Sequence, residues 1–152
     1  MRGGAAPPAL LFAIVIGFAA LIHFVSAQAS DPPLVQAAKT NNVAAVARLL
    51  GEGADPNGHD RLRNTALIYA ARDGRLEIAR ALIAGGADVN WVDGENVTPL
   101  ILASHKNHID IVRLLLSRSA DREVRDKWAR TALDYAQRRG DDDPIAVLLA
   151  QP

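Results

Sequence analysis

The sequence predicts an all-α solenoid of about four helix-turn-helix units, and three recurring patterns support this fold class. Leucine recurs every 33 residues, at Leu34, Leu67, Leu100 and Leu133. Alanine keeps the same interval, at Ala37, Ala70, Ala103 and Ala136. A second leucine series follows it as well, at Leu49, Leu82, Leu115 and Leu148. Because the apolar residues inside each interval follow helical spacing, this fixed period indicates stacked helical repeats.

Length, charge and composition exclude several classes of protein. The 152 residues are enough for one modest domain. The formal net charge is zero, so no broad basic surface for nucleic acid is expected. The chain contains no cysteine, which excludes disulfides, thiolate catalysis and cysteine-based zinc sites.

Residues 1–29 have the pattern of a secretory signal peptide. Arg2 is the only charge before Asp31, and an apolar run follows it over residues 10–25. Small residues then occupy two possible cleavage positions near Ala27 and Ala29. A periplasmic or secreted protein is therefore expected. The alternative is an uncleaved inner-membrane anchor, because the run approaches the length that spans a bilayer.

The first unit, about residues 31–58, begins at two prolines after Asp31 and has the features of a cap. The second unit covers about residues 59–91. Thr65 is a candidate N-cap for a helix over residues 66–73, and Gly74 can end that helix in the left-handed region. Residues 76–84 then show the apolar spacing of a second helix. Asn41, Asn107 and Gly140 occupy the slot of Gly74 in the other units, and all three tolerate positive φ.

The third unit covers about residues 92–124 and the fourth about residues 125–150. Pro99 follows Thr98 at the first position of a helix, where a missing N–H does no harm. The recurring alanine predicts a seam between units that has room only for a methyl group. In the last unit, residues 141–143 are three aspartates that suit the start of a final helix over residues 145–150.

The repeated motifs together resemble the ankyrin repeat. Thr-Ala/Pro-Leu-x-x-Ala is followed by Gly or Asn, then by Leu-Leu and by Gly-Ala-Asp-Val-Asn, and the pattern covers residues 31–150. The resemblance implies an ankyrin-repeat domain over residues 30–152, in which antiparallel helix pairs carry projecting β-turn fingers. Two departures matter. The usual His after Thr-Pro-Leu is replaced by Ile68, Ile101 and Asp134, so a local hydrogen bond should be lost. The usual finger glycine is replaced by Arg63, Asn96 and Ala129, so we expect less regular fingers.

The resemblance implies binding of another protein rather than catalysis. The sequence shows no motif for a nucleophile, a phosphate-binding loop, a cofactor or a metal. His105 and His108 could suggest a metal clamp, but Asn107 in the helix-ending slot should turn the two rings apart. We expect a monomer that binds no nucleic acid and meets a membrane only through residues 1–29. A membrane-tethered scaffold component is the alternative function.

Ankyrin proteins generally bind partners through their finger tips and the exposed side of their first helices. In this register the predicted partner-binding residues are Arg61, Leu62, Asn64, Arg72, Trp91, Val92, Glu95, His105, Lys106, Arg125, Lys127, Trp128, Arg130, Arg138 and Arg139. His59, Asp73 and Val97 map to the same surface. Trp91 fits either a contact or a filler between fingers, whereas contact is favoured for Trp128. The basic cluster near the C-terminus fits either an acidic partner or a solvated rim.

Overall fold

The structure is a computed structural model that describes residues 30–151. The predicted signal peptide or anchor at residues 1–29 lies outside the described residues. Within them the chain is all-α, and the only strand-like pairing is an isolated bridge between His59 and Thr65. Among the described helices, none has the length and apolar character needed to span a membrane. The helices are α2 (Pro33–Lys39), α3 (Val43–Gly51), α4 (Ala66–Asp73), α5 (Leu76–Ala84), α6 (Pro99–His105), α7 (Ile109–Leu116), α8 (Ala132–Gln137) and α9 (Pro144–Ala150).

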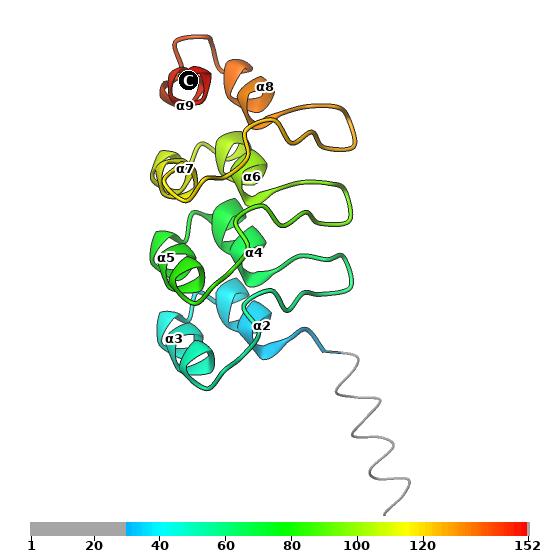
Figure 1. Cartoon of the computed structure of the whole chain (residues 1–152), viewed down its shortest axis with the longest axis vertical. Helices are drawn as coiled ribbons and strands as arrows, with labels where there is room; N and C mark the ends of the chain where they lie inside the picture. Colours follow the sequence, from blue (N-terminus) through cyan, green and yellow to red (C-terminus); the bar gives the residue numbers. More distant parts are fainter. Residues whose placement is uncertain (1–29, 152) are drawn as a thin grey trace, which may run out of the picture. The chain divides into compact units, whose positions relative to one another are not determined.

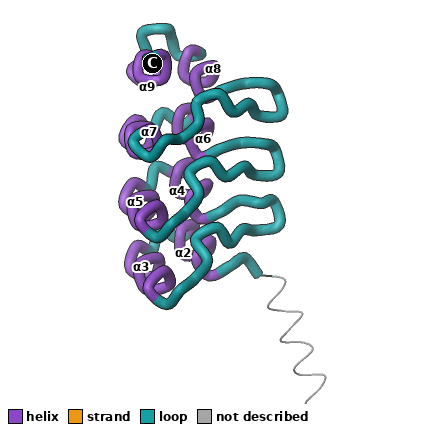
Figure 2. Tube along the Cα trace, in the orientation of Figure 1, coloured by secondary structure: helices purple, strands orange, loops and turns teal. Residues whose placement is uncertain are grey.

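The helices of residues 32–151 form two columns in a repeat solenoid (Figure 1). The first helices α2, α4, α6 and α8 pack on one another in one column, and α3, α5, α7 and α9 form the other. Three long loops project on the side of the first helices, as Figure 2 shows. We name them finger 1 (residues 52–65), finger 2 (residues 85–98) and finger 3 (residues 117–131).

Threonine caps start three of the first helices, as the sequence predicts. The hydroxyl of Thr65 accepts from the N–H of Ile68 at 3.3 Å, and Thr98 does the same for Ile101 at 3.2 Å. At Thr131 the carboxylate of Asp134 also accepts from the backbone N–H of Thr131 at 2.7 Å, which completes a capping box. The expected loss of a local hydrogen bond is therefore wrong for Asp134, because its carboxylate replaces the missing group.

The residues predicted to end the first helices all have positive φ. The values are 54° at Asn41, 72° at Gly74, 64° at Asn107 and 129° at Gly140. These turns, together with the threonine caps, fix the helix boundaries from both sides. The predicted helices over residues 66–73 and 76–84 are confirmed as α4 and α5.

The recurring alanines line the seam between successive first helices. Ala70, Ala103 and Ala136 are 0% exposed and Ala37 is 6% exposed. Leu34, Leu67 and Leu100 are buried beside them in one continuous hydrophobic core. The burial supports the interpretation that these positions leave room for a methyl group only.

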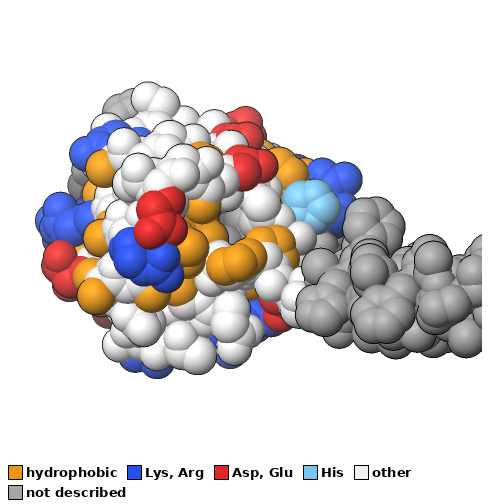
Figure 3. All heavy atoms as spheres, turned by 90° about the horizontal axis from the view of Figure 1, so that it is seen from below, with side chains coloured by type: hydrophobic (Ala, Val, Ile, Leu, Met, Phe, Trp, Pro, Cys, Tyr) orange, Lys and Arg blue, Asp and Glu red, His pale blue; other side chains and the backbone are white. Residues whose placement is uncertain are grey.

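The two terminal units close the stack with partly apolar surfaces. Figure 3 looks onto the α2–α3 end and shows hydrophobic side chains interspersed with charged ones. Helix α3 contributes the exposed Val43 and an ion pair between Arg48 and Glu52 at 2.8 Å. In the last unit Asp143 caps α9 and accepts from the N–H groups of Ile145 and Ala146, so the prediction of an acidic helix start is confirmed.

Candidate protein-binding surface

Each finger is built around one aspartate, and these three residues share the 33-residue spacing. A single carboxylate oxygen accepts two backbone N–H groups from the tip of its own finger, at 2.8–3.0 Å. The acceptors and their donors are Asp60 with Leu62 and Asn64, Asp93 with Glu95 and Val97, and Asp126 with Trp128 and Arg130. The carboxylate therefore replaces the turn's missing hydrogen bonds and holds the backbone of the tip in one shape.

The fingers are regular, so the expectation of irregular fingers is wrong. Arg63, Asn96 and Ala129 adopt φ values of 64°, 60° and 59° in the positions where a glycine was expected. The left-handed region disfavours side chains, but the aspartate hydrogen bonds hold the turn there in all three fingers. The recurrence of aspartate at this spacing was the signal for this in the sequence.

Neighbouring fingers are hydrogen-bonded to one another. The N–H of Gly94 donates to the carbonyl of Leu62, and the N–H of Lys127 donates to the carbonyl of Glu95, both at 3.0 Å. The side chains of Lys127 and Glu95 also form an ion pair. The fingers thus form a continuous wall rather than three independent loops.

Trp91 is a filler between fingers 1 and 2. Its indole N–H donates to the carbonyl of Arg63 at 2.8 Å, and its ring lies 5.3 Å from the ring of His59. The guanidinium of Arg63 lies 5.4 Å from the centre of the indole. The alternative left open by the sequence is thereby settled in favour of packing within the wall.

Two buried tyrosines tie the fingers to the first helices. The hydroxyl of Tyr69 donates to the second oxygen of Asp60 at 2.6 Å, and Tyr135 makes the same bond to Asp126 at 2.6 Å. Burial raises the pKa of each aspartate, but the hydrogen bonds from tyrosine and backbone outweigh it and leave both pKa values below normal. Sequence reasoning missed these pairs, although both tyrosines lie nine residues after their aspartates.

Basic side chains recur every 33 residues at the ends of the first helices, at Lys39, Arg72, His105 and Arg138. They surround the two tyrosines. The Tyr69 ring centre lies 4.4 Å from the ammonium of Lys39 and 4.5 Å from the guanidinium of Arg72. Tyr135 lies 4.8 Å from the ring of His105. Two guanidinium groups are also close to Tyr135, that of Arg130 at 4.9 Å and that of Arg138 at 5.2 Å.

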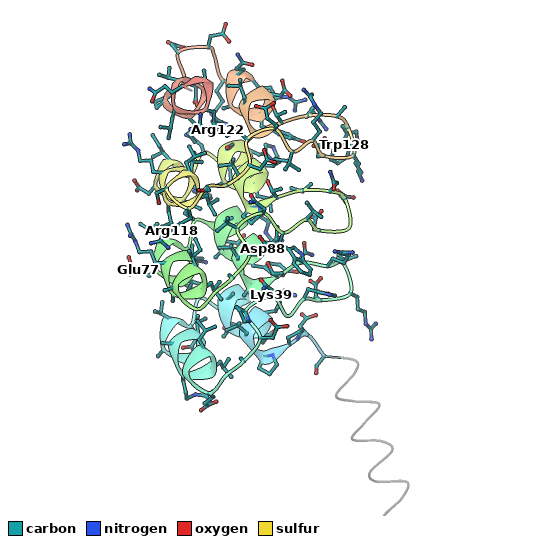
Figure 4. The ribbon with its side chains drawn as sticks, viewed as in Figure 1. Lys39, Glu77, Asp88, Arg118, Arg122 and Trp128 are labelled. Carbon is teal, nitrogen blue, oxygen red and sulfur yellow. The ribbon has the colours of Figure 1, made fainter. Side chains whose placement is uncertain are left out.

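A groove of about 350 Å³ opens beside Tyr135, between fingers 2 and 3 and helices α6 and α8. We name it the Trp128 groove. Its lining residues are Asp93, Glu95, Val97, Ile101, Leu102, His105, Trp128, Arg130, Tyr135 and Arg138. Five of these were predicted as partner-binding residues: Glu95, His105, Trp128, Arg130 and Arg138. Trp128 is 53% exposed and lies far out on finger 3 (Figure 4).

Other predicted residues lie outside this groove. Leu62 and Asn64 line a second hollow between fingers 1 and 2 with Glu95, near the exposed Arg61. Arg72 is paired with Asp73 at 2.9 Å, and Lys106 is exposed beside His105. Two finger residues face inward: Val92 is half-buried and Val97 is buried.

Three of the predicted basic residues are held by bonds within the domain. Arg125 donates to the carbonyl of Ala129 at 2.9 Å, and Lys127 pairs with Glu95. Arg139 makes two bonds to Asp143 and donates to the carbonyl of Ser104 at 2.9 Å. The basic cluster available to a partner is therefore smaller than the sequence suggested.

The two histidines of α6 and the following turn face different neighbours. His105 packs on Tyr135, whereas the Nε2–H of His108 donates to the carbonyl of Arg72 at 3.1 Å. Over residues 30–151, no group of three acidic, histidine or cysteine side chains is arranged to hold a metal ion.

The repeat fold and the exposed finger face define a class of helical repeat proteins that bind through their surface. A family model described as ankyrin repeats (3 copies) matches residues 10–93, 34–126 and 82–152. The chain belongs to the ankyrin repeat family. Ankyrin repeats generally mediate protein–protein interactions, and their domains are typically non-catalytic. No curated protein matches the sequence.

Proposed function

We propose that this chain is a non-catalytic module that binds a partner protein in the Trp128 groove after export to the periplasm or the outside of the cell. The observation that carries the proposal is the exposure of Trp128 at the edge of a groove lined by arginines. Tryptophan and arginine are the residue types most enriched among binding hot spots. The buried seam and the wall of fingers do not need an exposed indole.

Trp128 is held in place before any partner arrives. Its backbone N–H donates to Asp126 at 2.8 Å. The ammonium of Lys127 lies 4.3 Å from its ring and the guanidinium of Arg130 lies 4.7 Å away. A side chain that is already ordered loses less conformational entropy on binding, which favours affinity.

The groove is small compared with a drug-sized site and suits one or two side chains of a larger partner. The remaining contact area would come from the finger wall and the exposed ends of the first helices. Leu62 on finger 1 is exposed on the same row of tips as Glu95 and Trp128. These tips extend the contact beyond the groove.

Export is supported by the apolar run and small residues of the N-terminal segment. Intact-mass measurement of the protein recovered from its native host tests this part. Loss of about 27–29 residues is expected. Recovery of the whole chain from the membrane fraction would instead favour the membrane-tethered scaffold.

The binding surface is tested by site-specific photo-crosslinking in living cells. A photoreactive amino acid replaces Trp128 in one variant and Arg118 in the other. Arg118 is exposed on the side of the second helices, away from the fingers (Figure 4). We expect a discrete crosslinked protein at position 128 and none at position 118. Equal products at both positions, or none at either, would refute the proposed surface.

A further inference from the structure

The carboxylates in and around the Trp128 groove are already occupied by groups of the same chain. Glu95 pairs with Lys127, and Asp93 accepts two backbone N–H groups of finger 2. Asp126, beneath the groove, accepts from Tyr135 as well as from the tip of finger 3. These acidic groups have little capacity left to neutralise further cations.

The cations of the groove are in the opposite situation. Among residues 30–151, Arg138, Lys106 and His105 form no ion pair. Arg130 lies 3.8 Å from Asp126, but its Nε atom is buried without a hydrogen-bond partner. Burial lowers the pKa of His105, and the charges of Lys106, Arg138, Arg139 and Arg130 lower it further. The groove therefore carries a positive potential that the chain itself does not balance.

The equivalent position one unit pair earlier provides an internal comparison. Tyr69 is also flanked by two cations, but Arg72 is paired with Asp73 at 2.9 Å and Lys39 lies 3.9 Å from Asp60. The same framework is thus internally neutralised around Tyr69 and not around Tyr135. Because the whole chain has a net charge of zero, the excess at Tyr135 is a local feature.

We infer that the Trp128 groove binds an acidic segment of the partner protein, with an aspartate or glutamate carboxylate between Arg130 and Arg138 and a neighbouring apolar side chain on Trp128. This inference rests on the proposed function and specifies the chemistry of its partner. Guanidinium groups match a carboxylate in shape and charge, and an indole beside them offers an apolar face. The occupied carboxylates of Asp93 and Glu95 on the groove wall disfavour a polyanion such as nucleic acid, which would place phosphates against them.

Binding is measured with a fluorescein-labelled peptide, acetyl-Glu-Glu-Leu-Glu-Glu-amide, by fluorescence anisotropy at pH 7.5 and low salt. The control peptide has glutamine in place of each glutamate. We expect saturable binding of the acidic peptide that weakens as salt is added, and at least about fivefold weaker binding of the glutamine peptide. Equal binding of the two peptides would overturn the inference.

The groove is located with two matched variants that each remove one exposed arginine charge. Arg138→Gln should weaken binding of the acidic peptide by about fivefold or more, because its guanidinium has no other carboxylate partner. Arg118→Gln, on the opposite side of the stack, should leave the affinity within about twofold. The same loss in both variants would show a general charge effect and overturn the inference. Circular dichroism melts check that both variants fold.

The contact with Trp128 is read separately from its own fluorescence. The chain has two tryptophans, so Trp91→Phe leaves Trp128 as the single reporter. Its emission should shift on addition of the acidic peptide and remain unchanged with the glutamine peptide. An emission unchanged by either peptide would contradict contact with Trp128, and anisotropy on the unmodified protein still decides the question if Trp91→Phe does not fold.

Failure of this inference is distinguishable from failure of the proposed function. Discrete crosslinking at position 128 together with equal affinity for both peptides would keep the binding surface and remove the acidic partner. Binding to vesicles containing phosphatidylglycerol, without binding to the peptide, would also refute an acidic protein segment.

Discussion

Replacing Tyr69 with phenylalanine should lower the free energy of unfolding by about 1.5–2 kcal/mol. The substitution keeps the ring and removes only the hydroxyl that donates to Asp60 at 2.6 Å. Asp60 is 9% exposed, so water cannot fully replace the lost donor. A hydrogen bond to a charged group contributes roughly 1.5–3 kcal/mol. We expect the lower half of that range because the amide of Asn64 still donates to the same oxygen at 3.3 Å.

Thermal and urea unfolding followed by circular dichroism measure this loss. For a domain of this size, the change corresponds to a fall in Tm of about 5–10 °C. A double-mutant cycle with Asp60→Asn isolates the pair, since asparagine keeps an oxygen for the backbone donors of finger 1. Coupling of about 1 kcal/mol or more between the two sites is expected. Additive effects of the two substitutions would refute the assigned bond.

The pH dependence provides an independent check with a defined sign. The pKa of Asp60 is lowered in the folded protein, in part by the Tyr69 hydroxyl. Its contribution to stability is therefore fully present above the unfolded value of about 3.9 and is lost as the pH falls through the lower folded value. The stability difference between the native chain and Tyr69→Phe should narrow below about pH 4. A difference that stays constant down to pH 2 would contradict the argument.

Three further substitutions test the seam, the fingers and the helix-ending turns. Ala103→Glu should destabilise the domain by about 3 kcal/mol or more, through overpacking and a buried charge, and a melt like that of the exposed control Lys106→Glu would contradict the methyl-sized seam. Ala129→Gly should raise stability by about 0.5–1 kcal/mol by relieving a φ of 59° in finger 3, and a lower urea midpoint would argue against strain there. Gly74→Ala should lower stability by more than about 1 kcal/mol, because its φ is 72° and the new Cβ would lie 2.7 Å from the His108 ring. His108→Ala in that background should restore only part of the loss, and complete restoration would show that the backbone is unstrained.

Much of the fold could be predicted from the sequence because each helix boundary carries its own chemical signal. Thr65 and Gly74 bracket α4 with a side-chain cap and a left-handed turn, so both ends follow from local chemistry. The recurring alanines likewise predicted the seam, since burial at helical spacing has few alternatives. These inferences needed only neighbours in sequence.

The site was harder to predict because its contacts join residues about 30 or more apart. The role of Trp91 depends on the carbonyl of Arg63, 28 residues earlier, which spacing alone does not reveal. Arg139 reaches the carbonyl of Ser104, 35 residues away, and so leaves the binding surface. Long side chains can choose among several partners, and only the structure shows which one they take.

The carboxylates that shape the finger turns bond to main-chain N–H groups and not to the side chains at the outermost positions. Leu62, Glu95 and Trp128 occupy the same place in successive turns, yet they are as different as an aliphatic group, an acid and an indole. Variation at these three places is thus decoupled from folding of the turn. The chain could be retargeted by diversifying them, in a library whose members all inherit the same backbone.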